Sequence, residues 1–160
     1  MAEILELSES KSWHQARSEW TLAEVRHVDD PETCLCGHFP IIEICSIKNR
    51  LNGRVAEVGN ICVKKFMGLP SHKIFDCLRR ISKDVTKGLN GETVEYAYGK
   101  NLISDWEKDF SFNTGKKRVL SDKQAVVREK INRKIIAGIK RKASVSSFLS
   151  QIKREYQALP

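Results

Sequence analysis

Hydrophobic and polar residues alternate over the first part of the chain in the manner of β-strands. Residues 20–28 predict one strand, and a short helix over residues 8–18 is expected before it. Ile41 to Lys48 alternates as a second strand and Arg54 to Val58 as its return strand. Asn52-Gly53 lies between them and is a strong signal for a two-residue hairpin turn. The pattern predicts a β-hairpin module with an N-terminal helix.

Helical spacing of apolar residues dominates after this hairpin. Cys62 to Met67 is expected to begin one helix and residues 71–85 to form another, while residues 94–110 carry an apolar residue at every fourth position. A further helix begins at Ser121, with Gln124 three residues later in a capping-box pattern, and a last helix begins at about Ser144. The apolar stripe of the Ser121 helix comprises Val127, Ile131, Ile135 and Ile139.

These elements predict an α+β fold in which a small zinc-binding β-hairpin module is followed by a mostly helical subdomain. We assign residues 1–70 to the hairpin module with its N-terminal helix and residues 71–160 to the helical, basic subdomain. A chain of 160 residues is the length of one compact unit, and 41% hydrophobic with 30% charged residues is ordinary for a globular protein. The pattern contains no run long enough for a membrane span and no basic-apolar secretory leader, so we expect a cytoplasmic protein.

Positive charge is concentrated at one end of the chain. The formal net charge is +8, but residues 1–112 are slightly acidic, and residues 113–160 hold 13 Lys and Arg against three acids. A localised basic block is typical of contact with a polyanion, most often DNA or RNA. The residues expected to make this contact are Lys116, Lys117, Arg118, Arg128, Lys130, Arg133, Lys134, Lys140, Arg141 and Lys142.

Four candidate zinc ligands bracket the hairpin. Cys34 and Cys36 flank a tight knuckle that ends at His38, and Cys62 follows the return strand. Zinc takes four such ligands from two chain segments. A two-residue turn at Asn52-Gly53 places Cys62 opposite Glu43, and a longer loop centred on Leu51 places it opposite Pro40, near His38. Strand register therefore leaves the fourth ligand open between His38, which we favour, and Cys45, which lies in an otherwise buried strand where cysteine is commonly a small hydrophobe. Five cysteines are an odd number and fit a reducing compartment, and we expect the fifth, Cys77, to pack in the core.

Three segments of the sequence together resemble the signature of a known class of proteins. They are C-L-C-G-H-x-P-I, I-K-N-R-L-N-G-R and V-G-N-I-C-V-K-K-F, within residues 33–67. Together they resemble a signature of short zinc-finger-like proteins of bacteriophages and bacterial mobile elements. L-S-D-K-Q with K-I-N-R-K-I, within residues 104–136, is similar to a helix that accompanies this signature. The resemblance implies a metal site at Cys34, Cys36 and Cys62, and it brings no known activity.

Acidic residues near residue 105 are the one candidate for a catalytic cluster. Asp105, Glu107 and Asp109 lie close together, with Asp105 and Asp109 one helical turn apart. Trp106 and Phe110 alternate with them as expected core anchors, so a solvated polar face explains the acids better than a nuclease site does. We therefore expect no enzymatic activity, with a metal-dependent nuclease as the alternative.

The sequence as a whole favours a nucleic-acid-binding accessory protein held together by structural zinc. The alternative is a protein-interaction module that inhibits a host or defence protein and uses its basic face to bind an acidic partner. The sequence leaves the oligomeric state open.

Overall fold

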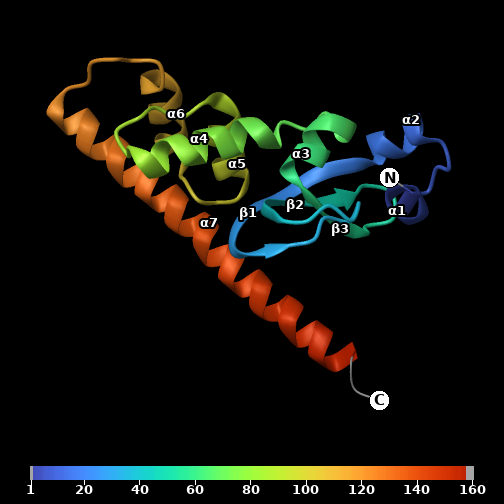
Figure 1. Ribbon diagram of the computed structural model, residues 1–160. Helices are drawn as coiled ribbons and strands as arrows, with labels where there is room; N and C mark the ends of the chain where they lie inside the picture. Colours follow the sequence, from blue (N-terminus) through green and yellow to red (C-terminus); the bar gives the residue numbers. More distant parts are fainter. Residues whose placement is uncertain (1, 158–160) are drawn as a thin grey trace. The chain divides into compact units, whose positions relative to one another are not determined.

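The computed structural model of the protein describes the backbone of residues 2–157 and the side chains of residues 2–139. Contacts divide the chain into two compact units, Met1–Arg79 and Arg80–Pro160, which we call the sheet unit and the helical unit (Figure 1). The α+β class predicted from the sequence is confirmed, since a three-stranded antiparallel sheet is combined with helices.

The sheet has the strand order β1-β2-β3 (Figure 1). Its strands are β1 (Trp20–Glu32), β2 (Ile41–Asn49) and β3 (Val55–Gly59). The expected strand over residues 20–28 is thus present, but it continues through Pro31. Because β1 lies at the edge of the sheet, a proline without an N–H donor is tolerated there.

A loop of residues 50–53 lies between the hydrogen-bonded residues Asn49 and Arg54, so the longer connection centred near Leu51 is present and the two-residue turn at Asn52-Gly53 is not. Asn49 N–H donates to the carbonyl oxygen of Arg54 at 2.8 Å, and Cys45 pairs with Val58. The Asn49 side chain stabilises the longer loop, since its Oδ1 accepts the N–H of Leu51 at 2.8 Å. Gly53, at φ +75°, takes the last loop position.

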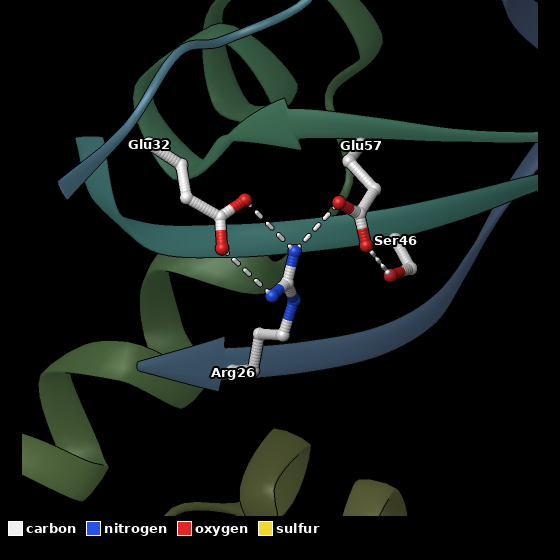
Figure 2. A network of polar contacts seen from close by, with 4 residues as sticks. All are labelled: Arg26, Glu32, Ser46 and Glu57. Atoms are coloured by element: carbon white, nitrogen blue, oxygen red, sulfur yellow. Dashed lines mark hydrogen bonds and ion pairs between the residues drawn. The ribbon is translucent and has the colours of Figure 1, made fainter. Parts of the chain in front are cut away.

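Arg26 on β1 is 1% exposed and lies between two carboxylates on the sheet (Figure 2). Its two terminal nitrogens donate to the two oxygens of Glu32 at 3.1 Å each, and Nη2 also donates to Glu57 on β3 at 2.6 Å. Ser46 on β2 donates to the other oxygen of Glu57 at 3.4 Å. The network therefore ties all three strands together through one buried cation.

The N-terminal segment folds as separate short helices and not as the single helix expected over residues 8–18. These are α1 (Ala2–Leu7), α2 (Trp13–Ala16) and η1 (Arg17–Glu19). The buried Glu19 carboxylate accepts the backbone N–H groups of Glu9 and Ser10 at 2.9 and 2.8 Å, and this holds the chain in a turn between the helices. It also accepts from Asn49 at 2.7 Å, which attaches the segment to the end of β2.

A helical segment follows β3 directly and continues the chain toward α4. It comprises α3 (Asn60–Cys62) and η2 (Val63–Met67), and Gly68 at φ +67° ends it. The helix expected from Cys62 is therefore present and begins at Asn60. Ser71, the first residue of α4 (Ser71–Lys83), donates to Asn60 Oδ1 at 2.7 Å.

The expected helix over residues 94–110 is two helices, α5 (Gly91–Gly99) and α6 (Asp105–Thr114). Asn101 at φ +54° breaks the helical path, and Ser104 starts α6 with a capping box. Trp106, expected in the core, is instead 61% exposed and stacks on Phe110 with ring centroids 5.4 Å apart.

One long helix, α7 (Asp122–Gln157), replaces the two helices expected from Ser121 and Ser144. No proline lies within α7, and its one glycine, Gly138, does not interrupt the helix. The apolar stripe is confirmed: Ile131, Ile135 and Ile139 are buried and Val127 is half-buried.

Candidate metal centre

The first two cysteines of the centre lie in a tight loop between β1 and β2. Gly37 N–H donates to the Cys34 carbonyl oxygen at 2.8 Å, and Cys34 N–H donates to the His38 carbonyl oxygen at 2.9 Å. Gly37 has φ +83°, a conformation that side chains other than glycine rarely adopt. This loop is the knuckle predicted from the cysteine spacing.

Cys62 on α3 completes a group of three thiols. The sulfur atoms of Cys34, Cys36 and Cys62 all lie within 4.8 Å of one another, and those of Cys36 and Cys62 are 3.5 Å apart. Sulfur ligands of a tetrahedral zinc ion are roughly 3.8 Å apart, given a Zn–S bond of about 2.3 Å. All three thiols are free, and the group can hold a metal ion.

Backbone N–H groups and the other thiols control the charge at this cluster. Gly59 N–H donates to the sulfur of buried Cys34 at 3.2 Å. The backbone N–H of His38 donates to the sulfur of exposed Cys36 and lowers the pKa of that thiol. Burial, together with the neighbouring thiols, raises the pKa of Cys62 to about 12. Cys36 therefore ionises more readily than Cys62, and the full negative charge of three thiolates needs a cation to stabilise it.

Three thiols leave one position of a tetrahedral site for another ligand. Within the described part of the chain, the donor atoms that lie within 4.8 Å of one another include neither His38 nor Cys45. His38 is exposed at the end of the knuckle. Cys45 is fully buried on β2 and pairs with Val25 on β1, and burial raises the pKa of its thiol to about 11. Cys77 is buried on α4.

The residues predicted to contact nucleic acid differ in their surroundings. Lys116, Lys117 and Arg118 are exposed in the segment between α6 and α7. Lys130 is exposed on α7, whereas Arg133 pairs with Glu129 at 3.6 Å and Lys134 with Glu107 at 2.8 Å. The side chains of Lys140, Arg141 and Lys142 lie outside the described residues.

The expectation that Arg128 projects outward to contact nucleic acid is wrong. Arg128 is buried, and its guanidinium donates to the carbonyl oxygens of Thr86 at 3.2 Å and of Thr114. Desolvation by this burial lowers the pKa of Arg128. A helical stripe of Val127 and Ile131 does not reveal this role, because the two carbonyls that Arg128 satisfies come from the segment after α4 and from the end of α6.

Two acidic residues of α6, Asp105 and Glu107, make side-chain contacts within the helical unit. Glu107 is half of the capping box with Ser104 and also pairs with Lys134, while Asp105 accepts a hydrogen bond from the hydroxyl of Tyr98 at 2.6 Å. Among the described residues, no group of three acidic or histidine donors gathers closely enough to hold a metal ion; the cysteine cluster alone does so.

None of the helices in the described part of the chain is long and apolar enough to cross a lipid bilayer. Comparison with protein-family models, with curated proteins and with solved structures found no match for this chain.

Proposed function

We propose that this protein is a zinc-stabilised, nucleic-acid-binding accessory protein. Zn²⁺ is held by Cys34, Cys36 and Cys62, with His38 as the favoured fourth ligand, and the exposed lysines of the helical unit contact phosphate groups. The observation that carries the proposal is the cluster of three thiols, drawn from two separate segments of the chain. The phage or mobile-element origin implied by the sequence resemblance belongs to the same proposal.

The choice of zinc follows from the donor atoms. Thiolates are soft ligands, and a cluster of cysteines in a tetrahedral arrangement is typical of structural zinc or iron–sulfur sites. The N–H groups of Gly59 and His38 that donate to sulfur support a thiolate site, because such hydrogen bonds stabilise the ionised form. With four protein ligands the ion is closed to substrate, and its role is to hold the knuckle against α3.

The nucleic-acid part rests on the exposed cations of the helical unit. Within the described part of the chain, Lys116, Lys117, Arg118 and Lys130 make no ion pair, so their charges are available to phosphate. The segment from Lys116 to Arg118 is a compact patch of three positive charges. Aromatic residues are not interleaved with it, so binding is expected to depend on charge and little on sequence.

The metal is tested by elemental analysis of the purified protein, which should give about one zinc per chain. Titration of metal-free protein with Co²⁺ adds a spectroscopic readout, since thiolate ligation produces intense charge-transfer absorption. A well-folded protein that binds neither metal would refute the zinc assignment.

Nucleic-acid binding is tested by the fluorescence anisotropy of labelled duplex DNA and RNA over a range of salt concentrations. Lys116→Ala with Lys117→Ala should weaken binding and reduce the slope of log K against log salt by about 2 for duplex DNA. Lys64→Ala with Lys65→Ala removes the same charge from the sheet unit and should leave the slope unchanged. A Lys140/Arg141/Lys142→Ala variant tests the rest of the basic block. No binding even at low salt would reject this part of the proposal.

A further inference from the structure

A groove of about 460 Å³ lies beside the thiol cluster in the sheet unit. One wall is the start of β2, from Ile41 to Glu43, and the other runs along α3 and η2. Cys62 belongs to the lining, so the same residue borders the candidate metal centre and the groove. The remaining lining residues are His38, Pro40, Gly59, Asn60, Ile61, Lys65 and Phe66.

The surface of this groove is mainly apolar, and its largest aliphatic side chains are exposed. Ile61 is 74% exposed on α3, and Ile42 is 44% exposed on the opposite wall. Phe39, adjacent in sequence to two lining residues, is 60% exposed. Large apolar side chains gathered around a concave surface are typical of sites that bind an apolar group of a partner.

Charge at the groove is positive. Glu43 is the one acidic residue of the lining, and its charge is already paired. Its carboxylate accepts a hydrogen bond from Asn60 Nδ2 at 2.9 Å and forms an ion pair with Arg79. Lys65 and the neighbouring Lys64 are exposed and make no ion pair within the described part of the chain. The Lys65 ammonium lies 5.2 Å from the centre of the Phe66 ring, at the edge of the apolar surface. An occupant with an apolar group next to negative charge is therefore complementary to this groove.

We propose that the groove binds a short acidic segment of a partner protein, in which an aliphatic or aromatic side chain is followed by carboxylates. The apolar side chain lies between Ile42 and Ile61, and the carboxylates pair with Lys64 and Lys65. A peptide fits better than a nucleobase, because the exposed side chains of the two walls, Ile42 and Ile61, are aliphatic and the polar groups of Asn60 and Glu43 already bond to each other. Base recognition uses stacking aromatic rings and free hydrogen-bonding groups. This binding is separate from phosphate contact by the helical unit, so either can fail without the other.

The test starts with selection from a random-peptide display library on the full-length, zinc-loaded protein, with counter-selection on the Ile61→Asp variant. Enriched peptides are synthesised with a fluorescent label, and their affinities are measured by anisotropy. Peptides that pair an apolar residue with Asp or Glu are expected. Ile61→Asp should weaken them by roughly tenfold or more, which corresponds to about 1.4 kcal/mol.

Matched variants separate the groove from the basic helical surface. Lys64→Ala with Lys65→Ala should weaken the peptides several-fold and reduce their salt dependence, while Lys116→Ala with Lys117→Ala should not. Val126→Asp, at an exposed position of α7, should also leave the affinity unchanged. Metal content and circular dichroism verify that each variant is folded, and Ile42→Thr on the opposite wall replaces Ile61→Asp if that variant does not fold.

Three outcomes would overturn the proposal. The first is that no peptide is enriched over counter-selection, and the second is that enriched peptides bind the groove variants as well as they bind the wild type. The third is that labelled oligonucleotides lose affinity in the Ile61 or Ile42 variants, which would make nucleic acid the occupant of the groove.

Discussion

Replacing Arg26 with methionine is the sharpest test of how the sheet is held together. Methionine keeps much of the unbranched length of the side chain and removes the charge with its contacts to Glu32 and Glu57 (Figure 2). A hydrogen bond to a charged group contributes about 1.5–3 kcal/mol, so loss of the three contacts sets a gross upper limit of roughly 5–9 kcal/mol.

Two effects reduce this cost. The carboxylates of Glu32 and Glu57 are 32% and 39% exposed, so water can solvate them once Arg26 is gone. The substitution also removes the desolvation of a guanidinium that is 1% exposed and whose Nε has no hydrogen-bond partner among the described residues. Breaking a fully buried ion pair costs about 3–5 kcal/mol, and the net cost expected here is smaller, about 1–3 kcal/mol.

The assay is urea unfolding of the zinc-loaded protein in a Trp106→Phe background. Trp13 and Trp20 are then the remaining tryptophans, and both belong to the sheet unit, so fluorescence reports on that unit. Glu57→Gln should cost less than Arg26→Met, because Arg26 retains its two contacts to Glu32. The double variant should show a coupling of about 0.5–3 kcal/mol. If Arg26→Met is as stable as the wild type, or if the coupling is zero, the network does not stabilise the sheet.

Three further predictions concern the metal centre and the helical core. Cys62→Ser should lower the zinc content and destabilise the sheet unit, while Cys77→Ser should keep the metal at a modest cost in stability. Elemental analysis measures the metal content, and equal content in both variants would contradict the prediction. Zinc affinity should rise with pH, by about tenfold per pH unit for each proton released, because the Cys62 thiol, whose pKa is raised to about 12, must lose its proton to bind the metal. Competition with a chromophoric chelator between pH 6 and 8 measures the affinity. An affinity that does not change with pH would count against thiolate ligation. Ile131→Ala should destabilise the helical unit by about 2–5 kcal/mol, since the side chain is buried. Chemical denaturation followed by circular dichroism measures this change, and a change near zero would contradict the prediction.

The parts of the fold that the sequence predicts correctly depend on local signals. Gly37 within the cysteine knuckle, the alternation along β2 and the isoleucine stripe of α7 each specify their element from neighbouring residues alone. The three thiols could be found from cysteine spacing on the two sides of one hairpin. Zinc as the bound metal, and His38 as its fourth ligand, remain predictions.

Errors arise where a distant or conformational feature decides the structure. The hairpin register depends on the Asn49 side chain, which closes a longer loop than the Asn52-Gly53 signal indicates. The four-residue periodicity through Trp106 continues across a real break at Asn101, because spacing alone does not contain the positive φ that interrupts the helix. The sequence around Arg26 does not reveal its buried role, since its partner Glu57 is 31 residues away.

The corner between β3 and α3 connects the metal centre, the sheet and the groove. Gly59 ends β3 and donates to the Cys34 sulfur, and a Cβ at this position would lie 3.1 Å from Ile41, a residue of the groove wall. Asn60 then donates to Glu43 on β2 and accepts from Ser71 at the start of α4. A cation bound by Cys62 would therefore fix the one segment on which all of these contacts depend. On the zinc proposal, metal binding at this position would add its free energy to the folding of the sheet unit and would also set the position of Ile61 at the groove.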